Sequence, residues 1–149
     1  MRHAKAGERR SWAGDDIERP LSAKGWKQAD AIAQRLGPLG VIDLVSSPYV
    51  RCVQTLEPLA MFIDAEVRVD DRLGEGTPFE QTLALLDELD DGAVLCSHGD
   101  VIPETIQALA RRGLDVRSAA DWRKASIWVI ERNNRGRYTR ARVWPPPVL

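Results

Sequence analysis

Both histidines of the chain stand beside residues suited to phosphoryl chemistry. His3 directly follows Arg2, and His98 follows an apolar run typical of a strand. Arg51 comes shortly after a third such run. A neutral imidazole is nucleophilic near pH 7, because its ordinary pKa is about 6.5. Guanidiniums remain cationic and bind phosphate oxygens through paired N–H groups. If these turns converge, two imidazoles and two guanidiniums surround one phosphate-sized position.

The elements that must position these side chains alternate along the chain. Apolar spacing and punctuation predict helices at 22–36, 48–63, 79–89 and 101–113, and strands at 41–47, 66–70, 92–97, 126–131 and 137–144. Ser22 suits a helix N-cap, and Gly37 suits a helix end. Pro58 is expected to kink or shorten the second helix. The turn sequence NNRG predicts that the last two strands form a hairpin.

This alternation predicts an α/β fold, a three-layer α/β/α sandwich with a mostly parallel central sheet. Ligand sites of such sheets lie beyond the carboxyl ends of the strands, where the three polar turns are expected to meet. Helix N-termini near 48 and 101 would add backbone N–H groups there. Neither an internal repeat nor a linker divides the chain, so residues 1–149 are predicted to form a single domain.

Composition excludes several classes of function. The 149 residues include 21 basic and 22 acidic side chains, so a global field for a nucleic acid polymer or a membrane is not expected. No apolar run approaches the roughly 18 residues of a membrane-spanning helix. Only two cysteines occur, Cys52 and Cys96. They are interpreted as packing residues of a cytoplasmic protein.

Other routes to phosphoryl and acyl transfer lack their motifs. A Walker loop, a G-x-S-x-G elbow and a zinc-ligand spacing are all absent. A cysteine phosphatase would need an arginine six residues after its nucleophile, and those positions hold Pro58 and Ile102. The remaining nucleophile is an imidazole. Because guanidiniums supply the charge, we expect neither a metal nor another cofactor.

Four separated segments carry a resemblance to a known family. They are RHAKAG, RPLSAKGWKQA (19–29), SSPYVRCVQTLEPLA (46–60) and SHGDVI (97–102). With this spacing the chain resembles the histidine phosphatase superfamily, which has the phosphoglycerate mutase-like fold. It is most similar to SixA-like phosphohistidine phosphatases and to the histidine-phosphatase domain of MutT-type Nudix hydrolases. The closing segment KASIWVIERNNRGRYTRARVWPPP resembles the Nudix-associated domains.

The resemblance implies a role for each matched residue. His3 corresponds to the nucleophile that becomes a phosphohistidine. Arg2, Arg51 and His98 correspond to the partners that bind the phosphoryl oxygens, a role that suits their charge and donors.

Two features depart from the family pattern. Family members carry the Arg-His pair at the end of a central strand of about five residues, whereas only Met1 precedes it here. Arg2-His3 is therefore interpreted as the tip of the innermost strand. An upstream start codon, an excised domain and a shortened strand are the alternatives.

The general acid is the second departure. Asp71, Glu75 and Glu80 are candidates, and Glu75, flanked by glycines, is preferred. A weak acid signal favours phosphoramidates or other substrates with good leaving groups. It also argues against a mutase.

The sequence therefore predicts a metal-independent phosphatase acting through a phosphohistidine. Its expected substrate is a phosphohistidine protein, a nucleotide or a small phosphoester. Lys5, Arg9 and Arg10 are predicted to form a basic lip that selects polyanionic substrates. The alternatives are a catalytically weak phosphate-binding module and a domain that partners a Nudix hydrolase.

Overall fold

Helices and strands alternate in the computed structural model, which describes residues 1–149. The helices are α1 (Ala23–Leu36), α2 (Val50–Ile63), α3 (Phe79–Glu88) and α4 (Val101–Arg111). The strands are β1 (Asp43–Ser46), β2 (Val67–Val69), β3 (Ala93–Cys96), β4 (Asp115–Val116), β5 (Ile127–Arg132) and β6 (Tyr138–Trp144). Each predicted helix and strand is present, and only the two-residue β4 was missed.

The strands form two groups of three. One group has the order β2-β1-β3 and is entirely parallel, with Val45 opposite Leu95. The other has the order β4-β6-β5, in which β5 and β6 form the predicted antiparallel hairpin and β4 pairs parallel to β6. The group β2-β1-β3, whose strands lead to Arg51 and His98, is thus parallel. The group β4-β6-β5, formed by the C-terminal part of the chain, is mixed.

The first residues lie between these two groups. Arg2 forms a parallel bridge with Ser97, and the His3 N–H donates to the Ser97 carbonyl at 3.1 Å. On the opposite side the Arg2 N–H donates to the Ser126 carbonyl at 3.1 Å. The pair Arg2-His3 therefore lies at the tip of the innermost strand position, as the sequence predicted.

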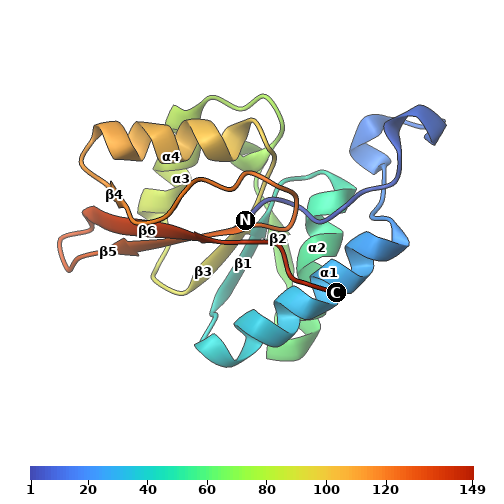
Figure 1. Cartoon of the computed structure of the whole chain (residues 1–149), viewed down its shortest axis with the longest axis horizontal. Helices are drawn as coiled ribbons and strands as arrows, with labels where there is room; N and C mark the ends of the chain where they lie inside the picture. The colour runs from blue at the N-terminus through green and yellow to red at the C-terminus, as the bar shows by residue number, and fades with distance from the viewer.

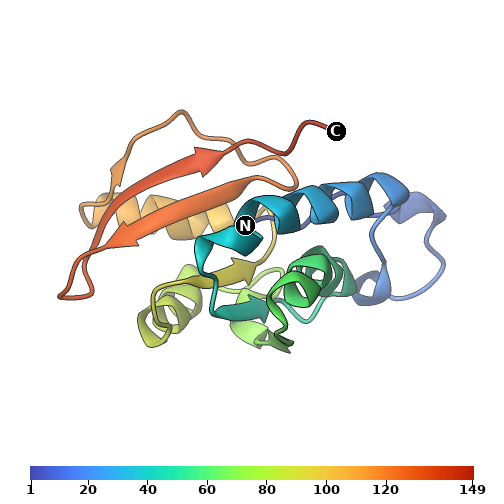
Figure 2. The same ribbon diagram turned by 90° about the horizontal axis from the view of Figure 1, so that it is seen from below.

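Helices cover both faces of the strands (Figures 1 and 2). Helices α1 and α2 pack together on one face, where Ile32, Leu56 and Leu44 belong to one buried cluster. Helices α3 and α4 pack on the other face, and Leu109 contributes there to a second cluster with Trp128. Burial of both faces stabilises the layers and confirms the predicted three-layer α/β/α architecture.

Local signals explain most helix boundaries. The Ser22 hydroxyl accepts from the Gly25 N–H at 3.1 Å and caps α1. Helix α1 ends at Leu36, and a short 3-10 turn then leads to Gly40, whose φ of 79° requires the left-handed region. Pro58 does not shorten α2, which continues to Ile63. Of the two expected effects, shortening is not observed, because packing of α2 against α1 outweighs one lost backbone hydrogen bond, and the kink stays a prediction.

A large apolar cavity lies away from both histidines. It has a volume of about 670 Å³ and lies between β3 and β5, lined mostly by apolar side chains such as Val94, Leu95 and Ile127. Neither His3 nor His98 lines it. The fold therefore separates an apolar opening in the sheet from the polar site at the strand ends. No helix has both the length and the apolar character needed to cross a membrane.

Candidate active site

A second pocket, of about 400 Å³, lies at the carboxyl ends of β1, β3 and the first residues. Its lining is almost entirely polar and includes both histidines. The lining residues are Arg2, His3, Lys5, Ala6, Gly7, Glu8, Arg9, Arg19, Arg51, Glu75, His98, Gly99, Asp100 and Lys124. Although the apolar cavity is larger, the smaller pocket holds the titratable side chains, so we assign the chemistry to it.

His3 is held in one orientation by its neighbours. Its side chain is buried, and Nδ1 lies 2.7 Å from the Ala4 carbonyl oxygen. A carbonyl only accepts, so Nδ1 carries the proton and Nε2 of the neutral ring keeps its lone pair. The pKa of His3 is lowered to about 3, mainly by burial; the hydrogen bond to Ala4 opposes this shift, and the charges of Arg51 and Arg2 add to it. The imidazole is thus neutral near pH 7, with a lone pair on Nε2.

The elements around His3 fix its backbone as well. The Ala4 N–H donates to Thr55 Oγ1 at 3.0 Å, and Thr55 Oγ1 in turn donates to the Arg51 carbonyl at 2.7 Å. Thr55 lies one helical turn after Arg51 on α2. One buried hydroxyl therefore couples the nucleophile strand to the helix that carries Arg51.

His98 lies beside His3, with ring centroids 5.5 Å apart in an edge-on arrangement. Its Nε2 is 2.8 Å from the Ser47 hydroxyl, and that hydroxyl accepts from the Tyr49 N–H at 3.3 Å. The Ser47 hydroxyl still has its own proton, and we take it as the donor to Nε2. This leaves the His98 proton on Nδ1, a buried atom with no partner in the protein. Burial, followed by the charge of Arg51, lowers the pKa of His98 to about 4.

Two guanidiniums complete the surroundings of His3. Arg51 is 1% exposed, and its Nε has no hydrogen-bond partner. Arg2 donates from Nη1 to the Trp122 carbonyl at 2.6 Å, while its Nε is likewise buried and unpaired. With His98 Nδ1, three buried donors of this pocket are unsatisfied. Such groups are rare in folded proteins and here indicate a site for an anion.

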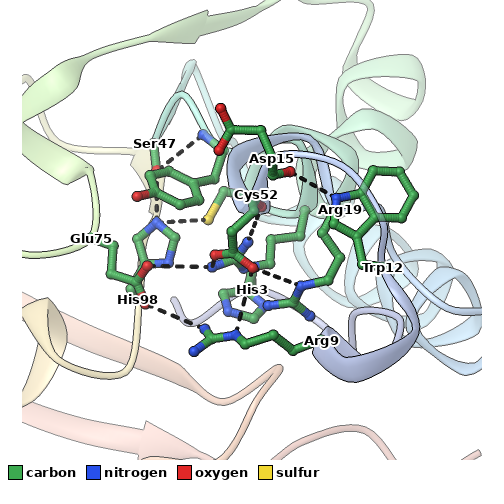
Figure 3. Close-up of polar contacts among 12 residues, drawn as sticks. His3, Arg9, Trp12, Asp15, Arg19, Ser47, Cys52, Glu75 and His98 are labelled. Atoms are coloured by element: carbon green, nitrogen blue, oxygen red, sulfur yellow. Dashed lines mark hydrogen bonds and ion pairs between the residues drawn. The ribbon is translucent and has the colours of Figure 1, made fainter.

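Carboxylates pair with several arginines around the pocket, and Figure 3 shows Glu75 joined by dashed lines to neighbouring guanidiniums. Asp16 Oδ2 accepts from Arg51 Nη2 at 3.2 Å, and Asp16 Oδ1 accepts from Arg19 Nε at 2.9 Å. Glu75 lies 3.7 Å from Arg51 and 3.9 Å from Arg9. These ion pairs fix Arg51 from the loop side and leave its Nε without a carboxylate partner.

The loop that carries Glu75 is tied to the start of α4. The Gly76 N–H donates to Asp100 Oδ2 at 2.8 Å. Of the three acid candidates, only Glu75 lines the pocket, whereas Asp71 begins a 3-10 turn and Glu80 lies in the first turn of α3. The geometry therefore favours Glu75 over the other two.

The structure brings most of the predicted site residues together. Arg2, His3, Arg51, His98 and Glu75 all line the pocket, as do Lys5 and Arg9. Arg10 is exposed and does not line it, so the predicted basic lip extends only as far as Arg9.

Sequence reasoning missed several other residues of this site. Asp16 and Arg19 had a local signal, since their i,i+3 spacing suits a salt bridge. Ser47 and Cys52, which approach His98 Nε2 at 2.8 and 3.6 Å, had none. Lys124 also lacked a signal, because 121 positions separate it from His3. No group of three or more His, Cys, Asp or Glu side chains that could hold a metal ion is present.

The fold and this pocket are consistent with one superfamily of proteins. The model of the histidine phosphatase superfamily (branch 1) matches residues 1–81. The chain belongs to this superfamily, and its expected resemblance is confirmed.

A relative and several solved structures agree with this membership. The chain is 34% identical over 136 residues to an 8-oxo-(d)GTP phosphatase from Mycolicibacterium smegmatis, covering 87% of this chain and 42% of that protein. It thus spans about two fifths of that relative. A structure from Nakamurella multipartitia, assigned as the phosphohistidine phosphatase SixA, is 35% identical with a TM-score of 0.62, covering 76% of this chain and 64% of that one.

More distant structures show the fold alone. The protein histidine phosphatase SixA in complex with tungstate has a TM-score of 0.75 at 20% identity, covering 93% of this chain and 90% of that one. A mycobacterial glucosyl-3-phosphoglycerate phosphatase has a TM-score of 0.71 at 19% identity, covering 98% and 97%. These likenesses confirm the phosphoglycerate mutase-like architecture.

Proposed function

We propose that this chain hydrolyses phosphate monoesters or phosphoramidates through a phosphohistidine formed on His3. The observation that carries the proposal is the set of three unsatisfied buried donors, Arg2 Nε, Arg51 Nε and His98 Nδ1, on residues that surround the nucleophile. A phosphoryl group presents three oxygens that need such donors as charge develops in the transition state. The proposal treats residues 1–149 as one domain, since segments as far apart as Arg2 and Lys124 border the pocket.

The first step forms the phosphohistidine. Nε2 of His3 attacks phosphorus while the bond from phosphorus to the leaving oxygen or nitrogen breaks. The proton remains on Nδ1 and is donated in a hydrogen bond to the Ala4 carbonyl oxygen. This hydrogen bond stabilises the positive charge that the ring acquires. Arg2, Arg51 and His98 hold the equatorial oxygens.

The leaving atom takes its proton from an acid on the open side of the pocket. Glu75 is the candidate, because it alone of the predicted acids lines the pocket. In the second step the same carboxylate accepts a proton from water as that water attacks the phosphohistidine. The N–P bond then breaks, releasing inorganic phosphate and neutral His3.

The charge of the pocket lining indicates the class of substrate. Basic side chains outnumber acidic ones in the lining, with Arg2, Lys5, Arg9, Arg19, Arg51 and Lys124 against Glu8, Glu75 and Asp100. This balance favours anionic substrates and raises their local concentration. We include nucleotides among the candidates, together with phosphohistidine proteins and small phosphoesters, because the curated relative acts on 8-oxo-(d)GTP.

Metal-free turnover tests the proposal. We expect release of p-nitrophenol from p-nitrophenyl phosphate in the presence of EDTA, with competitive inhibition by vanadate and by phosphate. Turnover that requires an added metal ion would contradict the mechanism. Tight binding of vanadate without any turnover would instead support the alternative of a phosphate-binding module.

A further inference from the structure

The pocket has more room than one phosphoryl group needs. Its volume of about 400 Å³ lies within the range of about 300–1,000 Å³ typical of sites for whole small molecules. A phosphoryl group on His3, held by Arg2, Arg51 and His98, fills only the inner part. The remaining space is bordered by the other lining residues, among them Lys5 and Lys124.

Lys124 is placed there by a strained turn. The next residue, Ala125, has a φ of 68°, a left-handed conformation that non-glycine residues rarely adopt. Ala125 is fully buried, and its N–H donates to the His3 carbonyl at 3.1 Å. The turn is held from the same side by Arg2, which donates to the Trp122 carbonyl. The segment before β5 is therefore bonded directly to the catalytic strand, with Lys124 exposed at its centre.

The two adjacent basic residues of this turn differ in their partners. Arg123 is bound to Asp121 at 2.6 Å and does not line the pocket. Lys124 lines the pocket and has no ion-pair or hydrogen-bond partner. The turn thus directs one of its two cations toward the site and neutralises the other with a neighbouring carboxylate.

The basic residues that line the pocket also differ in whether they have a carboxylate partner. Arg9, Arg19 and Arg51 already contact the carboxylates of Asp16 or Glu75 within 4 Å. Arg2, Lys5 and Lys124 contact no carboxylate within that distance. Burial, followed by the charges of Arg2, Arg19 and Lys5, lowers the pKa of Lys124, so these cations are close enough to repel one another. A second anion beside the first would relieve that repulsion.

We propose that Lys5 and Lys124 form a second anion subsite, so that the preferred substrates carry another phosphate next to the one transferred. This inference rests on the proposed function for the position of the first phosphate. The substrate class is a compound with a terminal diphosphate or longer polyphosphate. A monophosphate would leave Lys5 and Lys124 without an anionic partner.

Calorimetric titration at constant ionic strength tests the subsite without requiring turnover. Inorganic phosphate probes the inner site, and methylenediphosphonate probes both sites. We expect the wild-type protein to bind the diphosphonate at least tenfold more tightly than phosphate. Lys124→Ala should weaken diphosphonate binding about tenfold. That loss should exceed the loss for phosphate at least fivefold.

Matched variants separate the subsite from a general charge effect. Lys27→Ala removes the same charge from the exposed side of α1 and should leave both affinities unchanged. Lys124→Arg should retain most of the diphosphonate affinity, and Lys5→Ala should reproduce the loss independently of the strained turn. Equal affinities of the wild-type protein for the two probes would overturn the inference. Equal effects of Lys124→Ala and Lys27→Ala would overturn it too.

The proposed function fails on a different observation. If the wild-type protein shows the tenfold preference but hydrolyses no phosphate compound, the subsite stands and the catalytic proposal falls. If it hydrolyses p-nitrophenyl phosphate but binds both probes equally, the catalytic proposal stands and the subsite falls.

Discussion

The Ser47 hydroxyl lies 2.8 Å from Nε2 of His98 and accepts from the Tyr49 N–H. When Ser47 donates its proton to Nε2, this pair sets the tautomer of His98. The proton of the ring is then on Nδ1, where it can be donated to a phosphoryl oxygen. Ser47 is therefore a positioning residue that acts through His98.

Ser47→Ala should remove this control of the tautomer. We expect kcat for p-nitrophenyl phosphate to fall about ten- to a hundredfold, because loss of one donor to a developing charge commonly has an effect of about that size. KM should change less than kcat. Ser46→Ala is the matched control, since Ser46 is equally buried but bonds to the Ser47 carbonyl and not to His98. Similar losses in both variants would show that Ser47 only supports the fold.

The two buried histidines make stability depend on pH. Their pKa values in the folded protein are about 3 for His3 and about 4 for His98, mainly because both are buried. In the unfolded chain both lie near 6.5, so below that pH the unfolded state binds more protons. The stabilisation is present in full above pH 6.5 and is lost as the pH falls toward the folded values.

Urea denaturation at a series of pH values measures this loss. We expect the free energy of unfolding to fall by about 2–4 kcal/mol between pH 7 and pH 5. The decrease should be smaller in a His3→Gln/His98→Gln double variant, which has no imidazole to protonate. An unchanged free energy of unfolding across this range would contradict the burial of neutral imidazoles.

Arg9 and Arg10 should differ in their effect on polyanionic substrates. Arg9 lines the pocket and lies near Asp16 and Glu75, whereas Arg10 is exposed outside it. Arg9→Ala should lower kcat/KM for a nucleoside triphosphate about three- to tenfold, a size typical of an exposed charged contact. Arg10→Ala carries the same change of charge one residue away and should have less than a twofold effect. Equal losses in the two variants would indicate a general electrostatic effect and not a contact.

The Arg2 side chain packs so close to residue 99 that this position should require glycine. A Cβ atom at residue 99 would lie 2.7 Å from Cζ of Arg2, so the guanidinium would have to shift. Because a flexible side chain can move, Gly99→Ala should lower kcat/KM about tenfold or more while changing the free energy of unfolding by less than about 1 kcal/mol. Arg2→Lys should show a comparable loss of activity. Wild-type activity in Gly99→Ala would show that the present position of Arg2 is not the catalytic one.

Much of this architecture could be predicted because it depends on short-range patterns. Apolar periodicity and the Ser22 cap predicted α1 within one residue, and the polar turns after two apolar runs located Arg51 and His98 at the strand ends. The shortening expected as one effect of Pro58 is not observed, since tertiary packing of α2 decides the helix length.

The rest of the site depends on contacts between distant segments. Asp16 reaches Arg51 from a loop whose path no periodic pattern determines. Lys124 enters the pocket because Ala125 adopts a left-handed conformation, which the sequence does not signal at an alanine. Arg10, by contrast, was expected at the pocket from its proximity to His3 along the chain. Both arginines lie in one 3-10 turn, Arg9–Ser11, and only Arg9 lines the pocket.

The phosphohistidine on His3 is the central claim, and quenched labelling tests it most directly. The protein is mixed with ³²P-labelled phosphoramidate or a labelled aryl phosphate, denatured within milliseconds, and treated with acid or alkali. We predict a label that is lost in acid and retained in alkali, is assigned to His3 by peptide mapping, and is absent from the inactive His3→Ala variant. An acid-stable label, a label on another residue, or substantial turnover by His3→Ala would contradict the mechanism.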